Sequence, residues 1–143
     1  MTKILAHCFG VAAIICTSLL GLTGSAHAQS VNFVIYVDTV SGPARQMVGP
    51  QVIHVRNDGS EATGVTVTFA APKGAKVDTT CQEDHLPGGV RSYTCALGTL
   101  VSGQIADIAF SISMNKSGTA EVGVEATCDQ GNTSGALLSI TIS

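Results

Sequence analysis

The sequence predicts an antiparallel β-sandwich of about seven strands, and three observations support this fold class. Apolar and polar residues alternate in one short run after another, which is typical of strands that bury one face. Turn-forming residues separate these runs at a spacing of roughly ten residues, as in all-β sandwiches. The mature part of the chain shows no helical period, in which apolar residues recur three and four positions apart along one face of a helix.

Residues 1–28 are predicted to be a secretory signal peptide that is cleaved from the mature protein. Lys3 lies near the start, an apolar run extends from Cys8 to Leu22, and Ala26 and Ala28 form the A-x-A cleavage pattern. The alternative is an uncleaved membrane anchor. We favour cleavage because the apolar run is short for a membrane span.

The mature chain, residues 29–143, is expected to form a single domain. Its 115 residues are enough for one modest hydrophobic core. Loss of Lys3 leaves six basic and ten acidic residues, a net charge of −4, with the basic residues scattered. This mild acidity argues against nucleic acid and against an anionic membrane as partners. Because of the predicted signal peptide, we expect an exported protein, periplasmic or extracellular at the cell surface. The acidic charge leads us to expect no membrane contact after signal removal.

The strongest pattern extends from Arg91 to Met114. A cysteine-bearing strand, a glycine-bounded turn at 98–103 and an alternating strand from Ala106 to Met114 follow one another there. The other predicted strands share the same alternation, with a short extended run at 75–80, and they cover 31–37, 51–56, 65–69, 120–128 and 138–142. We expect an Ig-like architecture, although the chain has no tryptophan.

Three cysteines remain after signal removal, Cys81, Cys95 and Cys128. An exported chain meets an oxidising compartment, so one disulfide and one leftover thiol are expected. We favour Cys81–Cys95 because the two are close in sequence, flank a turn-rich segment and should lie on neighbouring strands. Such a bridge should stabilise the fold by about 3 kcal/mol. Cys128 continues the apolar alternation of its strand and is predicted to be a buried, inert thiol.

Three segments of the mature chain resemble the domain-of-unknown-function 11 repeat of bacterial and archaeal surface proteins. They are residues 55–67 (VRNDGSEATGVTV), residues 71–77 (APKGAKV), and Cys81 together with residues 93–103 (YTCALGTLVSG). The cysteine followed by L-G-x-L-x-x-G is the most specific part. The chain departs from the family pattern at Ala70 and Ala71, where an aspartate and an apolar residue usually precede the proline.

This resemblance implies an Ig-like sandwich, a Cys81–Cys95 bridge, an exported location and a structural or adhesive role without catalysis. We expect the partner to be a protein or a cell-surface component, with a second copy of the chain as an alternative. We expect no cofactor, and we expect the protein not to be an enzyme.

The sequence gives only weak evidence for a metal site or for catalysis. Cys81 and the nearby Glu83, Asp84 and His85 are of metal-ligating types, with only His54 and Cys128 left to complete a site, and a disulfide would remove Cys81. Nucleophilic catalysis by Cys128 with a histidine would need an exposed thiol beside a base. Asp129 and Asn132 lack the ligand spacing of an EF-hand. We therefore expect no catalytic residue and no metal site.

The first strand carries two large residues, Val34 and Tyr36, on its nominally solvent-exposed face. Exposed apolar edge strands favour pairing with another chain, so these residues are a candidate assembly edge. Sheet curvature or a covering loop is the alternative.

The leading prediction is a non-enzymatic interaction domain. The second is a filament or surface-layer subunit joined by addition of the first or last strand, and the remote third is a small metal binder or enzyme using the loop 81–85.

Overall fold

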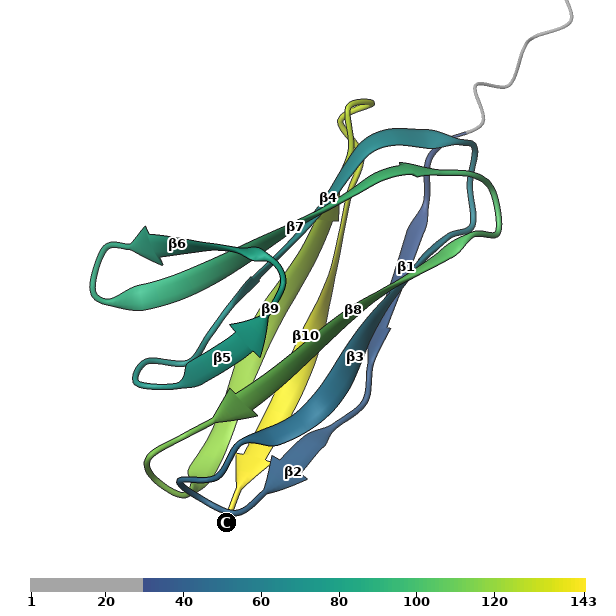
Figure 1. Cartoon of the computed structure of the whole chain (residues 1–143). Helices are drawn as coiled ribbons and strands as arrows, with labels where there is room; N and C mark the ends of the chain where they lie inside the picture. Colours follow the sequence, from purple (N-terminus) through teal and green to yellow (C-terminus); the bar gives the residue numbers. More distant parts are fainter. Residues whose placement is uncertain (1–29) are drawn as a thin grey trace, which may run out of the picture.

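The computed structural model describes residues 30–143, which form ten strands and no helix (Figure 1). The strands are β1 (Phe33–Val37), β2 (Val40–Gly42), β3 (Val48–Asn57), β4 (Ala62–Ala70), β5 (Lys76–Thr79), β6 (Gln82–Leu86), β7 (Val90–Leu100), β8 (Ile105–Ser113), β9 (Gly118–Thr127) and β10 (Thr133–Ile142). The predicted signal peptide lies outside the described residues. Among residues 30–143, no helix is long and apolar enough to cross a membrane.

Two sheets pack face to face (Figure 1). One has four strands in the order β1-β3-β8-β5, and the other has six in the order β2-β10-β9-β4-β7-β6. Every pairing is antiparallel except that of β2 with β10. β1 and β2 are consecutive in the chain but belong to different sheets, so the chain changes sheet between Val37 and Val40. The predicted all-β sandwich is confirmed.

The ten strands exceed the predicted number of about seven because three strands are short. β5 corresponds to the short extended run that the sequence predicts, whereas β2 and β6 were not predicted as strands. β2 has only three residues, and all five residues of β6 are exposed. A strand without a buried face has no apolar alternation, so pattern analysis cannot detect it.

The core lies between the sheets and is formed by alternate residues of both. On β8, Ile108, Phe110 and Ile112 are buried, as their alternation predicts. Phe69 of β4 packs between two other rings, with centroid distances of 5.3 Å to Tyr93 and 5.7 Å to Phe110. Each fully buried side chain of this size stabilises the fold by about 1.5–3 kcal/mol.

The disulfide joins Cys81 to Cys95, with a Cα–Cα distance of 4.6 Å. Cys95 is a buried residue of β7, and Cys81 immediately precedes β6, so the bridge clamps the open end of the β6–β7 hairpin. Gly88 and Gly89 close the hairpin with positive φ angles of 84° and 76°. The expected pairing on neighbouring strands is thus present in the structure.

Cys128 was predicted to be buried, but the structure shows it half-buried. β9 ends at Thr127, so the strand alternation no longer orients the next side chain. The Cys128 thiol instead lies 3.8 Å from the carbonyl oxygen of Asn132, within the loop that connects β9 to β10.

Candidate functional site

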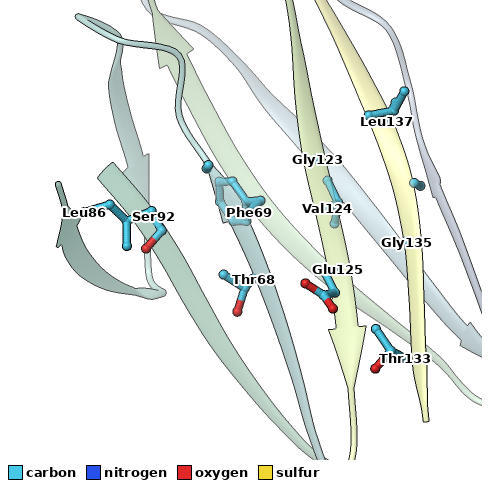
Figure 2. A pocket seen from close by; sticks show the side chains of 12 residues that line it. Thr68, Phe69, Leu86, Ser92, Gly123, Val124, Glu125, Thr133, Gly135 and Leu137 are labelled. Carbon is cyan, nitrogen blue, oxygen red and sulfur yellow. The ribbon is translucent and has the colours of Figure 1, made fainter. Parts of the chain in front are cut away.

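The outer face of the six-stranded sheet contains an open groove with a volume of about 800 Å³ (Figure 2). It crosses the sheet from β6 to β10 and is lined by Thr68, Phe69, Ala70, Leu86, Ser92, Gly123, Val124, Glu125, Thr133, Gly135, Ala136 and Leu137. We call this surface the outer groove.

Two glycines leave the β9–β10 side of the groove without side chains. Gly123 pairs with Leu137 across the β9–β10 ladder, and Gly135 pairs with Glu125. Both are positions in long strands where side chains normally stand on the outer face. The backbone of the two strands is therefore accessible at these positions.

Leucines stand on the two sides of the groove (Figure 2). Leu137 of β10 is 72% exposed, the largest value among the exposed large hydrophobic residues of the described chain. Leu86, the last residue of β6, is 45% exposed. Single exposed leucines are common on protein surfaces, but two that flank one apolar depression form a candidate contact surface.

Hydroxyl groups cover much of the rest of this face. The hydroxyls of Thr66 and Thr127 lie 2.8 Å apart and those of Thr68 and Thr94 lie 3.4 Å apart, so hydrogen bonds link neighbouring strands. Such cross-strand pairs stabilise a sheet by about 0.2–1 kcal/mol each. They form a polar surface beside the groove.

The charges on this outer face are all negative among the described residues of the six strands. By strand alternation and register, Asp84, Glu121 and Glu125 point outward, and none of them forms an ion pair within residues 30–143. Arg91 is the one arginine or lysine in the six strands, and its Nε lies 3.5 Å from Glu83 Oε1 on the inward side of the hairpin. The groove is thus bordered by unpaired carboxylates.

The inward side of the β6–β7 hairpin forms its own polar contacts. The hydroxyl of Tyr93 donates a hydrogen bond of 3.3 Å to Glu83 Oε2. Burial raises the pKa of Tyr93 above its ordinary value, and the nearby Glu83 carboxylate adds to the effect while Arg91 opposes it. These contacts link β6 to β7 within the hairpin.

The outer face of the four-stranded sheet is built differently. Tyr36 of β1 stacks on His54 of β3 with a ring-centroid distance of 4.7 Å, and His54 Nδ1 lies 2.7 Å from Asp107 Oδ1 on β8. Arg56 donates two hydrogen bonds, of 2.6 and 2.7 Å, to the carboxylate of Asp58. The hydrogen bond with Arg56 lowers the pKa of Asp58 and, in return, raises the pKa of Arg56.

The candidate assembly edge lies on this second face. β1 is an edge strand of the four-stranded sheet, and there Val34 is half-buried and Tyr36 is 43% exposed. β10, the last strand, lies between β2 and β9, so of these two strands only β1 is at a sheet edge. Pairing with another chain at this edge stays a prediction.

The residue types considered for a metal site are not brought together. Cys81 is in the disulfide, and alternation along β6 directs Asp84 away from Glu83 and His85. Within residues 30–143, no group of three His, Cys, Asp or Glu side chains is placed to hold a metal ion. His85 Nε2 lies 3.6 Å from Glu83 Oε1, which is an exposed surface pair.

The outer groove was not predicted from the sequence, although a signal was present. Gly123 interrupts the otherwise polar outward set of β9, between Glu121 and Glu125. Leu137 is a large apolar residue at an outward position of β10. A glycine or a leucine where the alternation calls for a polar side chain marks this kind of surface, but the sequence does not show that the two are adjacent.

Comparisons with known proteins identify the fold. No family model and no curated protein matches the chain. Among solved structures, an uncharacterised protein from Nocardia farcinica described as immunoglobulin-like aligns over 76% of this chain and 97% of its own, with a TM-score of 0.52 and 14% identity.

Two further structures have similar scores. A chain of a complex between a CaDoc0917 variant and CaCohA2 covers 78% of this chain and 100% of its own, with a TM-score of 0.51 and 11% identity. The secreted serine protease VesC from Vibrio cholerae covers 79% of this chain but only 23% of its own, with a TM-score of 0.50 and 13% identity. These likenesses show that the chain has an immunoglobulin-like fold.

Proposed function

We propose that the mature chain is a non-enzymatic, exported interaction domain that binds a partner protein through the outer groove. The observation that carries this proposal is the depression between Leu86 and Leu137, whose β9–β10 side is formed by Gly123 and Gly135. A surface that is apolar at its centre and polar around it is typical of protein-binding sites.

Export is supported by two features. The first 28 residues have the sequence pattern of a cleaved signal peptide, and Cys81 and Cys95 form a disulfide, which persists mainly in oxidising compartments. A periplasmic or cell-surface location follows, and an adhesive or structural role like that implied by the surface-protein repeat is consistent with it.

The absence of catalysis is part of the proposal. Among residues 30–143, His54 contacts Asp107 and His85 contacts Glu83, and neither histidine is hydrogen-bonded to a serine, threonine or cysteine. The nucleophile–base pair required for covalent catalysis is therefore not assembled there. The fold also occurs in a two-component complex, that of the CaDoc0917 variant with CaCohA2, which gives a precedent for a binding role.

Site-specific photo-crosslinking tests this function in the cells that make the protein. A benzophenone amino acid replaces Leu137 in the groove or Ile105 on the opposite outer face, which is a matched exposed apolar residue. We expect a discrete crosslinked product from position 137 and none from position 105, and the product should disappear when Gly123→Val fills the groove. Equal crosslinking from both positions would contradict the proposal.

A second function is favoured by the position of β1. We propose, as the alternative, that copies of the chain assemble into a filament or surface layer by strand addition at the β1 edge. β1 is apolar along its whole length and lies at the edge of its sheet, with Tyr36 exposed. Size-exclusion chromatography and negative-stain imaging of the mature protein test it, and a strict monomer at high concentration would exclude it.

A further inference from the structure

We infer that the occupant of the outer groove is a partner polypeptide segment with a large apolar side chain flanked by lysine or arginine. This inference rests on the proposed function and specifies the chemistry of the partner. Three features of the groove support it: glycines that the fold does not require, an exposed leucine beside them, and a border of carboxylates without a basic residue.

The groove glycines differ from other glycines of the chain because neither backbone conformation nor space requires them. Gly64 has a φ of 57°, and a Cβ there would collide with the carboxylate of Asp129. Gly123 and Gly135 have no positive φ; a Cβ on Gly123 would meet nothing within 4 Å, and one on Gly135 would meet only Val124 O at 3.5 Å. Glycine inside a strand lowers the free energy of unfolding by about 0.5–1 kcal/mol relative to alanine, so these two glycines make the fold less stable than it could be.

Glycine in a strand allows another molecule to approach the backbone closely. Gly123 is the cross-strand partner of Leu137, so the bare backbone and the exposed leucine are directly adjacent. An apolar side chain from a partner can lie over Gly123 and pack against Leu137, which removes both apolar surfaces from water. This contact supplies the apolar part of the recognition.

The charge of the partner follows from the border of the groove. Glu125 lies opposite Gly135, and Glu121 lies two residues before Gly123 on the same strand. With Asp84, they make this face acidic, and no lysine or arginine of the six strands compensates for them there. Lysine or arginine beside the apolar anchor would pair with these carboxylates, and an acidic partner would be repelled.

The same charges argue against a second copy of the chain as the occupant. Two copies related by a two-fold axis would bring identical surfaces together. The six strands of the second copy offer no outward lysine or arginine to pair with Glu121 and Glu125 of the first, so the contact would bring acidic surfaces together without compensation. A nucleic acid or an anionic lipid surface would be repelled for the same reason.

Titration with three short synthetic peptides tests the inference by NMR on the uniformly ¹⁵N-labelled mature protein. The first peptide alternates leucine with lysine, the second replaces each lysine by glutamate, and the third replaces each leucine by serine. We expect the first peptide alone to bind, with amide shifts centred on Gly123, Gly135 and Leu137. Its affinity should fall as salt is added, because the ion pairs at the groove border are screened.

Variants then separate the two parts of the recognition. Gly123→Val should weaken binding of the leucine–lysine peptide by about tenfold or more, since it fills the groove. Glu125→Gln should weaken it by about threefold and reduce its salt dependence. Ala109→Val, on the exposed outer face of β8, is the matched control and should leave binding unchanged.

Four outcomes would overturn the inference: equal binding of the glutamate peptide, shifts centred away from the groove, no binding of the leucine–lysine peptide at millimolar concentration, or groove shifts that depend on protein concentration alone. The last would identify a second copy as the occupant. Because the crosslinking at position 137 does not depend on partner charge, a crosslink to an acidic partner would contradict this inference and leave the proposed function standing.

Discussion

The two outer faces of the sandwich follow the same strand alternation but differ in what their side chains contact. On the four-stranded sheet, several exposed groups contact one another: Tyr36 stacks on His54, and His54 pairs with Asp107. On the six-stranded sheet, Leu137 stands in solvent beside a glycine, and Glu125 forms no ion pair within residues 30–143.

This difference shows how one fold can present a closed and an open surface. A face whose groups already have partners within the chain offers less to another molecule, because binding must first replace those contacts. A face with exposed apolar groups, accessible backbone and unpaired charge offers its contacts without that cost. The open face is therefore the better candidate for partner binding.

The largest expected effect concerns the disulfide, which clamps the hairpin that bears Leu86. Replacing Cys81 and Cys95 by serine should lower the free energy of unfolding by about 3 kcal/mol, as expected for closing a loop of this length. Urea denaturation measures the loss, and Cys128→Ser is the control. Hydrogen exchange should increase first in β6 and β7 on the open side, and uniform acceleration that includes β3 would contradict this localisation.

The second prediction compares glycines with and without a structural role. Gly123→Val should raise the free energy of unfolding by about 0.5–1 kcal/mol, because the strand gains a favourable residue without a clash. Gly64→Val should lower it by about 1–3 kcal/mol, mainly because its positive φ disfavours a β-branched residue and also because the Asp129 carboxylate would have to move. Thermal unfolding measures both. A destabilised Gly123→Val variant would show that the groove glycine has a structural purpose.

The third prediction tests the closed face. His54→Ala should lower the free energy of unfolding by about 0.5–1.5 kcal/mol, because it removes both the stacking with Tyr36 and the pairing with Asp107. Glu125→Gln on the open face should change stability by less than about 0.5 kcal/mol. Urea denaturation of the two variants provides the comparison, and equal losses would mean that the faces do not differ in internal contacts.

The smallest effect concerns the exposed pair of Arg56 and Asp58. The pKa of Asp58 is lowered from its ordinary value of 3.8 mainly by the hydrogen bond from Arg56. A lowered carboxylate pKa stabilises the fold above the ordinary pKa, and this stabilisation is lost as the pH falls through the folded-state value. Arg56→Gln should return the pKa of Asp58 toward 3.8 in an NMR titration, whereas an unchanged pKa would assign the shift to another group.

Local patterns in the sequence were sufficient to predict the fold class, most of the long strands and the disulfide partners. The alternation around Ile108, Phe110 and Ile112 identifies a buried face without knowledge of its neighbours. The outward position of Tyr36 follows from the same rule, and its exposure agrees with it. Cys81 and Cys95 could be paired because a turn-rich segment lies between them.

The groove required the tertiary structure because its residues come from five strands. Leu86 and Leu137 are far apart in sequence, and they flank one depression only because β7, β4 and β9 lie between β6 and β10 in the sheet. Strand order and register depend on contacts between distant segments, which alternation along a single strand does not encode. The sequence by itself therefore determined which side of each strand faces solvent, and only the folded sheet decided which of those solvent-facing residues are neighbours.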